Sequence, residues 1–167
     1  MRKANPFGVI DVLELYRETL NQIHDHAKME FPYECCGIIL SGGNQEFVRV
    51  CRNIQNQRHA EDPETYTRDA HTAYLMDPND QMNVYKESET ENRPIKAFYH
   101  SHPDHDAYFS DKDKEDATAW GEPTYPNAAY IVISVYNRVI KATRAYAWCV
   151  AETDFVEAPI IVKHPLE

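Results

Sequence analysis

The 167-residue sequence lacks any long apolar run, and no hydrophobic stretch follows the basic start Met1-Arg2-Lys3. A secretory signal needs an apolar core of roughly 7 to 15 residues, and a membrane-spanning helix needs about 20. We therefore expect neither of these segments, no membrane partner and a cytoplasmic location. Internal repeats and low-complexity tracts are also absent from the sequence.

Positive charge is scarce. Lysine and arginine number 17 against 27 aspartates and glutamates, which gives a formal net charge of -10. Proteins that bind nucleic acid present a basic surface, so this balance argues against a nucleic-acid partner. It is compatible with a basic or neutral protein partner and leaves the oligomeric state open.

The four cysteines do not form a zinc-binding pattern, because Cys35 and Cys36 are adjacent while Cys51 and Cys149 stand alone. Cys36 begins an apolar run and is expected to be a small core residue. Without paired spacings, a reduced setting is favoured. A sulfur-transfer enzyme that uses Cys35 or Cys36 as nucleophile is an alternative, and it requires an accessible thiol of low pKa.

The length predicts one domain over residues 1–167, with a structured core over about residues 9–162. Strand and helix patterns alternate, which predicts an α/β (α+β) fold with a mixed sheet flanked by helices. His24 and His26 lie off the apolar stripe of the first helix and are expected to face solvent. The expected elements are a helix after the capping box Asp11-x-x-Glu14 with the stripe Leu13, Tyr16, Leu20, Ile23 and Ala27, a hairpin of strands 36–40 and 47–51, a loop over 53–63, a brief strand near Tyr66, a helix over 78–89, a strand over 94–100, a hairpin of strands 129–136 and 139–148, and an edge strand over 155–162.

Two histidines stand at the end of the expected strand over residues 94–100. Side chains alternate along a strand, so His100 and His102 share one face. Pro103 ends the strand, and a polar loop follows. Two imidazoles at this spacing can bind one divalent metal ion, although the pair alone is also common on protein surfaces.

Ser110 and Asp113 form the second half of the pattern. Ser110 is expected to begin a helix that runs through Lys114 and Ala117 to Trp120, which places Asp113 one turn beyond the serine. The pair fits an N-terminal capping box, which requires no metal. The carboxylate can equally complete a three-ligand site with the histidines. The two interpretations are compatible, and an open fourth position is typical of catalytic zinc.

Together these residues resemble the signature of the JAMM (MPN+) metalloprotease family, His-x-His-Pro-x6-Ser-x2-Asp, at His100, His102, Pro103, Ser110 and Asp113. The segment Phe31–Gly42 is similar to the strand entry of short prokaryotic members, which carries a glutamate, here Glu34. The resemblance extends to about Tyr136. It implies a curved mixed sheet flanked by helices, of JAMM/cytidine-deaminase-like architecture.

The resemblance also implies roles. His100, His102 and Asp113 are expected to hold one zinc ion per chain. Glu34 would take a proton from water and pass it to the leaving amine, and Ser110 would hydrogen-bond the oxyanion. The implied activity is that of a zinc metallopeptidase, a deubiquitinase-like isopeptidase. The implied partner is a ubiquitin-like or sulfur-carrier protein with a Gly-Gly tail, cleaved after its C-terminal glycine.

The stretch over residues 53–89 is expected to shape the substrate groove, with residues 64–68 as a sheet edge for an extended peptide. The alternative for these residues is an ordinary sheet edge.

Three readings compete with this one. A non-catalytic MPN scaffold would only bind partners. A metallo-β-lactamase-like hydrolase is suggested by His-x-His-x-Asp-His over residues 100–105, but the one later histidine, His164, supplies too few further ligands, so His105 is expected to be a loop residue near the site. Glu34 could also be an ordinary exposed glutamate before a strand.

The final pair, Leu166-Glu167, is compatible with an expression-vector remnant.

Overall fold

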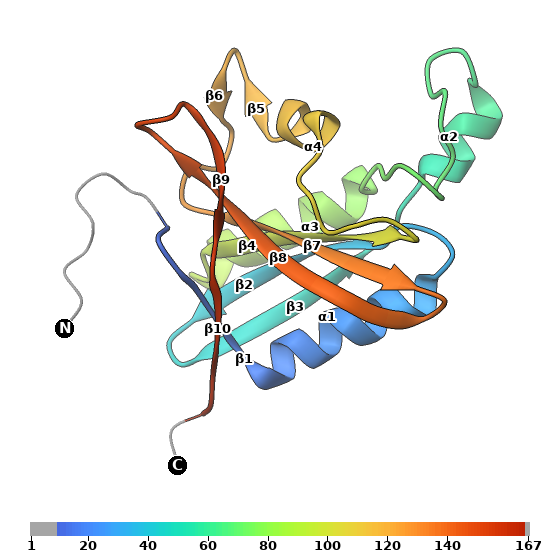
Figure 1. Ribbon diagram of the computed structural model, residues 1–167. Helices are drawn as coiled ribbons and strands as arrows, with labels where there is room; N and C mark the ends of the chain where they lie inside the picture. Colours follow the sequence, from blue (N-terminus) through green and yellow to red (C-terminus); the bar gives the residue numbers. More distant parts are fainter. Residues whose placement is uncertain (1–9, 166–167) are drawn as a thin grey trace.

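The computed structural model describes residues 10–165, so the interpretation of Leu166-Glu167 lies outside it. A six-stranded sheet in the order β3-β2-β4-β7-β8-β9 forms its centre (Figure 1). The elements are β1 (Leu13–Tyr16), α1 (Arg17–Glu30), β2 (Cys36–Gly42), β3 (Gln45–Cys51), α2 (Gln55–Glu61), α3 (Pro78–Thr90), β4 (Ile95–Pro103), α4 (Asp111–Asp116), β5 (Thr118–Ala119), β6 (Glu122–Pro123), β7 (Ala129–Tyr136), β8 (Val139–Cys149), β9 (Asp154–Ala158) and β10 (Ile160–Lys163).

The sheet is mixed because β4 and β7 run parallel while all other neighbours in it are antiparallel. The crossover between β4 and β7 contains α4 and the short β5–β6 hairpin. β4 occupies the middle of the sheet, between β2 and β7, and its carboxyl end therefore lies against both neighbours. The residues predicted to carry the chemistry thus lie at the end of one of the two central strands of the sheet.

Helices cover the sheet from both sides. α1 packs Leu20, Ile23 and Ala27 into one core layer, and Figure 1 shows this helix below the sheet. α3 contributes Val84 to the layer on the other face, where α4 also lies. The prediction of a curved mixed sheet flanked by helices is confirmed. Among residues 10–165, no helix is long and apolar enough to cross a membrane.

Several predicted elements are confirmed by the strands and helices observed. The hairpins β2–β3 and β7–β8 are present, and α3 corresponds to the helix predicted over residues 78–89. Gly37 in β2 has a specific role: a Cβ there would meet the Tyr99 ring at 2.4 Å, so only glycine lets this ring lie across β2. The sheet register that aligns β2 with β4 therefore depends on a residue without a side chain.

The first helix begins later than predicted. Leu13 and Tyr16 belong to β1, which pairs in parallel with β10, aligning Leu13 with Ile160. The box at Asp11 and Glu14 therefore caps no helix. The N-cap residue of α1 is Tyr16, whose side chain makes no capping bond. A partner strand almost 150 residues away overrides the local helical pattern.

The histidines of α1 are not solvated as predicted. His26 is buried, and its Nδ1 lies 2.8 Å from the Tyr99 hydroxyl of β4. His24 is half-buried, with its Nε2 2.7 Å from Thr143 Oγ1 in β8. Both side chains reach the sheet from the flanks of the apolar stripe, where strand hydroxyl groups serve as their partners.

Residues 53–63 were predicted as a loop, but α2 occupies Gln55–Glu61. This helix has a polar sequence, and one buried side chain, Gln55, anchors it by donating to Arg68 O at 2.7 Å. No apolar periodicity marks such a helix. The brief strand predicted near Tyr66 is wrong: residues 62–75 form turns and irregular segments, so residues 64–68 offer no sheet edge.

Two further boundaries differ. α4 ends at Asp116 rather than at Trp120, because Trp120 and Gly121 both adopt positive φ, 50° and 79°, and reverse the chain between β5 and β6. The strand predicted over residues 155–162 is divided at Pro159. Its first part is the sheet-edge strand β9, and its second part, β10, pairs with β1 instead.

Candidate active site

Glu34 lies directly before β2, and the sheet register brings it to the end of β4. Cys36 is aligned with His100 across the β2–β4 ladder. The Ser101 amide donates to Cys35 O at 3.1 Å, and the Cys35 amide donates to Ser101 Oγ at 2.8 Å. These reciprocal bonds fix the Glu34 segment to the His-x-His segment.

A second set of bonds holds Glu34 from the other side. Its amide donates to Ala70 O at 2.7 Å, and its carbonyl accepts from Asn53 Nδ2 at 2.9 Å. Asn53 Oδ1 also accepts from the amides of Gln55 and Leu75, both at 3.0 Å. Asn53 therefore joins Glu34 to the segment between α2 and α3. Sequence reasoning missed it, since one asparagine in a polar stretch carries no recognisable signal.

The two histidines project from the same face of β4, as strand alternation predicts. Both are buried, and their Nε2 atoms lie 3.1 Å apart. His102 Nδ1 lies 2.8 Å from Asp106 O. Because a carbonyl only accepts, Nδ1 carries the proton and Nε2 keeps its lone pair. The backbone thus presents His102 in the tautomer that a metal ion requires.

Ser110 and Asp113 form the predicted capping box, and the Asp113 carboxylate also lies beside both histidines. They form a complete capping box: Asp113 N donates to Ser110 Oγ at 3.1 Å, and Ser110 N donates to Asp113 Oδ2 at 2.9 Å. The same carboxylate places Oδ1 3.3 Å from His100 Nε2 and Oδ2 3.7 Å from His102 Nε2. The capping box fixes the Asp113 carboxylate, and the position of the short helix α4 places this carboxylate beside the two histidines.

The arrangement fits a small divalent cation. Two ligands of a tetrahedral zinc ion, each about 2.0–2.1 Å from the metal, are roughly 3.4 Å apart. The separations among His100 Nε2, His102 Nε2 and the Asp113 carboxylate range from 3.1 to 3.7 Å. Glu34 borders the same space, since its carboxylate and the two histidine nitrogens all lie within 4.8 Å of one another. The site therefore offers two imidazoles flanked by two carboxyl groups.

These two carboxyl groups differ in charge state. Burial, followed by repulsion from Asp113 and opposed by Arg68, raises the pKa of Glu34 to about 9. Burial also acts to raise the pKa of Asp113, but the neighbouring His100 and the hydrogen bonds from His100 and the Ser110 amide outweigh it and hold that pKa well below its usual range. Asp113 is suited to be a fixed anion and Glu34 to exchange a proton.

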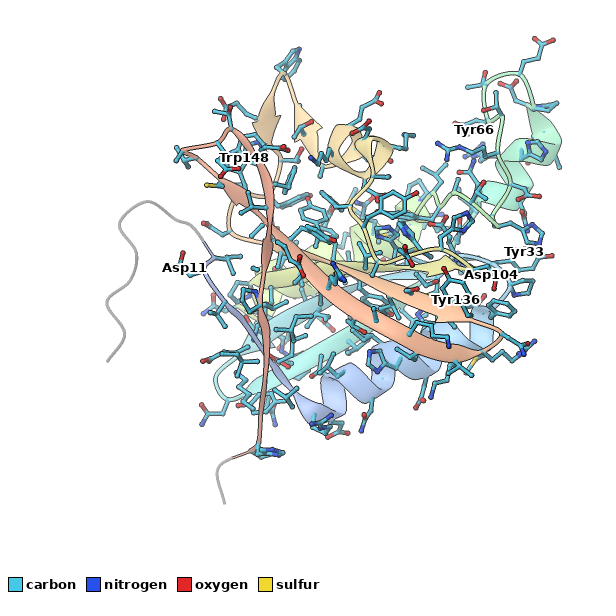
Figure 2. The ribbon with its side chains drawn as sticks, viewed as in Figure 1. Asp11, Tyr33, Tyr66, Asp104, Tyr136 and Trp148 are labelled. Atoms are coloured by element: carbon cyan, nitrogen blue, oxygen red, sulfur yellow. The ribbon has the colours of Figure 1, made fainter. Side chains whose placement is uncertain are left out.

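A groove of about 810 Å³ opens over these residues, with Glu34, His102, Ser110 and Asp113 in its wall. The segment between α2 and α3 forms the facing wall, as predicted for residues 53–89; Tyr66, labelled in Figure 2, lies on it. His105 also lines the groove, with its Nδ1 2.8 Å from Pro103 O, and is the loop residue expected. Sequence reasoning missed Tyr74, which lines this wall without any motif, and it named Arg68 only as part of the sheet edge predicted over residues 64–68.

Known proteins resemble this chain over most of its length. The model of the family described as prokaryotic homologs of the JAB domain matches residues 17–149. The chain belongs to this family. The JAMM (MPN+) resemblance of the sequence is thereby confirmed, and a metallo-β-lactamase-like hydrolase is excluded as the family.

Two curated relatives of this JAB-family chain carry functional names. A CysO-cysteine peptidase of Mycobacterium tuberculosis is 27% identical over 139 residues, covering 83% of this chain and 84% of that protein. A desampylase of Haloferax volcanii is 25% identical over 131 residues, covering 76% and 84%.

Two solved structures share the fold. One from Desulfitobacterium hafniense has a TM-score of 0.65 at 20% identity, covering 93% of this chain and 96% of its own. Another, from Salinibacter ruber, has a TM-score of 0.57 at 20% identity, covering 91% and 92%.

Proposed function

We propose that this JAB-family chain is a zinc-dependent peptidase or isopeptidase that hydrolyses the amide bond after the C-terminal glycine of a ubiquitin-like or sulfur-carrier protein. The observation that carries the proposal is the convergence of His100, His102 and Asp113 beside Glu34, at a groove whose wall includes Glu34, His102 and Asp113. The names of the peptidase and desampylase relatives support the substrate class.

His100, His102 and Asp113 are the proposed ligands of one zinc ion per chain. A zinc ion held by these residues would lower the pKa of a bound water molecule from 15.7 to about 7 and so make a nucleophile available at neutral pH. Asp113 contributes the negative charge, and the Asp106 carbonyl keeps His102 oriented. The burial of both histidines excludes bulk water from the ligand atoms.

Glu34 is the proposed proton carrier. As water attacks the glycine carbonyl carbon, Glu34 takes one water proton and delivers it to the amide nitrogen as the C–N bond breaks. The glycine is left with a carboxylic acid group, and the leaving group departs as the neutral amine. Burial raises the pKa of Glu34 above that of an ordinary glutamate, so the carboxyl group holds a proton well enough to carry it to the amide nitrogen.

Ser110 is the proposed oxyanion donor. Its Oγ accepts the Asp113 amide proton, which leaves its own hydroxyl hydrogen for an acceptor in the groove. A Gly-Gly tail suits this groove because it has no side chains to exclude. The substrate is therefore a protein with a thin, extended C-terminus, in a reducing cytoplasmic setting where the chain's four free cysteines persist.

The proposal is tested with Glu34→Gln and a carrier protein extended beyond its Gly-Gly terminus. The variant should retain bound zinc and the thermal unfolding midpoint of the wild type, yet cleave the fusion at least about a hundredfold more slowly. Full cleavage by Glu34→Gln would refute the proton-carrier role. Zinc binding without cleavage of any Gly-Gly-linked fusion by the wild type would instead favour a binding scaffold.

A further inference from the structure

The loop that joins β4 to α4, residues 104–110, connects His102 to Ser110 and contains no helix or strand. It is anchored at its start, where the Asp104 amide donates to Val135 O of β7 at 2.8 Å. Three consecutive carbonyl groups within it, those of residues 105, 106 and 107, each accept a hydrogen bond from a side chain outside the loop. The middle acceptor, Asp106 O, is the one that holds His102 Nδ1.

The two carbonyl groups that flank Asp106 O accept from hydroxyl groups of the β7–β8 hairpin. Ser134 Oγ donates to His105 O at 2.5 Å, and the Tyr146 hydroxyl donates to Ala107 O at 2.6 Å. The peptide group that bears Asp106 O therefore lies between two fixed points of the loop. Because its neighbours on both sides are held, this carbonyl keeps its direction.

Ser134 is a polar residue in a strand that is otherwise formed by apolar and aromatic side chains. It is buried, and the parallel register of β4 and β7 aligns it with His102, so both side chains project from the same face of the sheet. A buried hydroxyl group without a partner costs free energy. His105 O supplies that partner. The strand position beside His102 is thus occupied by a residue that holds the loop to which His102 is bonded.

We propose that Ser134 and Tyr146 are positioning residues that orient the metal ligand His102 through the backbone of the loop. With Asp106 O fixed, the imidazole carries its proton on Nδ1 and presents the Nε2 lone pair to the candidate metal site. Without the two hydroxyl groups the loop carbonyl can turn away. The proton is then free to move to Nε2, which removes the lone pair that a metal ion requires. The inference rests on the proposed function, because it takes His102 as a zinc ligand.

The test compares variants that lack only a hydroxyl group. Ser134→Ala and Tyr146→Phe should each bind zinc about tenfold more weakly than the wild type, the lower end of the usual effect of losing a group that orients a ligand. The matched control is Tyr136→Phe. Tyr136, labelled in Figure 2, belongs to the same hairpin, but its hydroxyl donates at 3.4 Å to the side chain of Asp106 rather than to a loop carbonyl. This variant should bind zinc as the wild type does. Competition with a chromophoric chelator measures the affinities, and circular dichroism checks that each variant is folded.

A second readout requires no metal. Two-bond proton–nitrogen NMR spectra of the metal-free protein distinguish the two imidazole tautomers, and the His102 signals are those missing from His102→Ala. The wild type and Tyr136→Phe should show the tautomer protonated on Nδ1. Ser134→Ala and Tyr146→Phe should show a mixture with the tautomer protonated on Nε2. A general loss of stability does not change the tautomer of a protein that remains folded.

Wild-type zinc affinity and an unchanged tautomer in both Ser134→Ala and Tyr146→Phe would overturn the inference, and so would an equal loss of affinity in Tyr136→Phe. Failure of the proposed function is a separate result. If the wild type neither binds zinc nor cleaves a Gly-Gly-linked fusion, the zinc peptidase proposal fails. The tautomer of metal-free His102 still decides the role of the two hydroxyl groups: a shift toward Nε2 supports it, and no shift refutes it.

Discussion

The ring of Tyr74 lies stacked on the imidazole of His100, with centroids 4.6 Å apart and planes inclined by 27°. Tyr74 comes from the segment between α2 and α3, whereas His100 lies on the central strand β4. The stack therefore ties the groove wall to a proposed metal ligand. It limits the rotation of the imidazole in a way that β4 alone does not.

Tyr74→Ala should weaken zinc binding about ten- to a hundredfold, the usual effect of removing a group that orients a ligand. Tyr74→Phe retains the ring and should bind zinc nearly as the wild type does. Competition with a chromophoric chelator measures both affinities. Unchanged zinc affinity in Tyr74→Ala, with a folded protein, would show that β4 suffices to orient His100.

Ser110 has two separable contributions, as helix cap and as hydroxyl donor. Ser110→Gly should lower the free energy of unfolding by only a few tenths of a kcal/mol, because glycine is tolerated at an N-cap. It should nevertheless lower turnover about a hundred- to a thousandfold, since no donor remains for the oxyanion. Urea denaturation and steady-state cleavage supply the two numbers. If turnover falls only as much as the loss of folded protein explains, Ser110 acts only as the helix cap.

Glu46 fastens the first strand and helix to the sheet. Its Oε1 accepts from the Tyr16 amide at 2.9 Å and from Thr19 Oγ1 at 2.7 Å, while Oε2 pairs with Lys96. Only 2% of the side chain is exposed. Glu46→Gln should reduce the free energy of unfolding by about 1–3 kcal/mol, because Lys96 loses its counter-charge. Urea denaturation measures the loss.

The control for Glu46→Gln is the double variant that also carries Lys96→Met, measured beside both single variants. If the ion pair carries the effect, the double variant should lose less stability than the two single losses added together. Strict additivity would assign the effect to the Tyr16 and Thr19 bonds instead.

His26 should make stability depend on pH. Burial lowers its pKa below the ordinary 6.5, so the folded state favours the neutral ring. The unfolded chain then binds more protons below pH 6.5, and stability is full above this value and lost as pH falls toward the folded-state pKa. The contribution is at most about 1.4 kcal/mol per pH unit. Urea midpoints at pH 7.5 and 5.5 should differ more in the wild type than in His26→Gln, with the exposed His164→Gln as control. Identical pH dependence in His26→Gln would contradict this.

The site was predictable where its geometry is local. Strand alternation places His100 and His102 on one face, and a capping box places Asp113 beside Ser110, so spacing alone predicts each of these two pairs. The approach of Glu34 depends on the β2–β4 register, which the sequence does not reveal without the family resemblance. That register requires the Tyr99 ring to pass over Gly37.

Features that depend on distant partners were not predictable. The sequence of β1 has the pattern of a helix start, and the strand partner that overrides this pattern, β10, lies at the other end of the chain. The sequence predicts that His26 is solvated, because its partner, Tyr99, belongs to another element and leaves no local signal. Arg68 and Tyr74 occupy a segment ordered by the side chains of Asn53 and Gln55, and such polar anchoring leaves no periodicity in the sequence.

The most direct test of the central claim is the zinc content per chain, by elemental mass spectrometry, of wild type, His102→Ala and the matched control His105→Ala. His105 stands in the adjacent loop, with its Nδ1 against Pro103 O, and is not one of the proposed ligands. The account predicts close to one zinc in the wild type and in His105→Ala, and a loss of zinc in a folded His102→Ala. Two metals per chain, or none after zinc is supplied to the wild type, would contradict it.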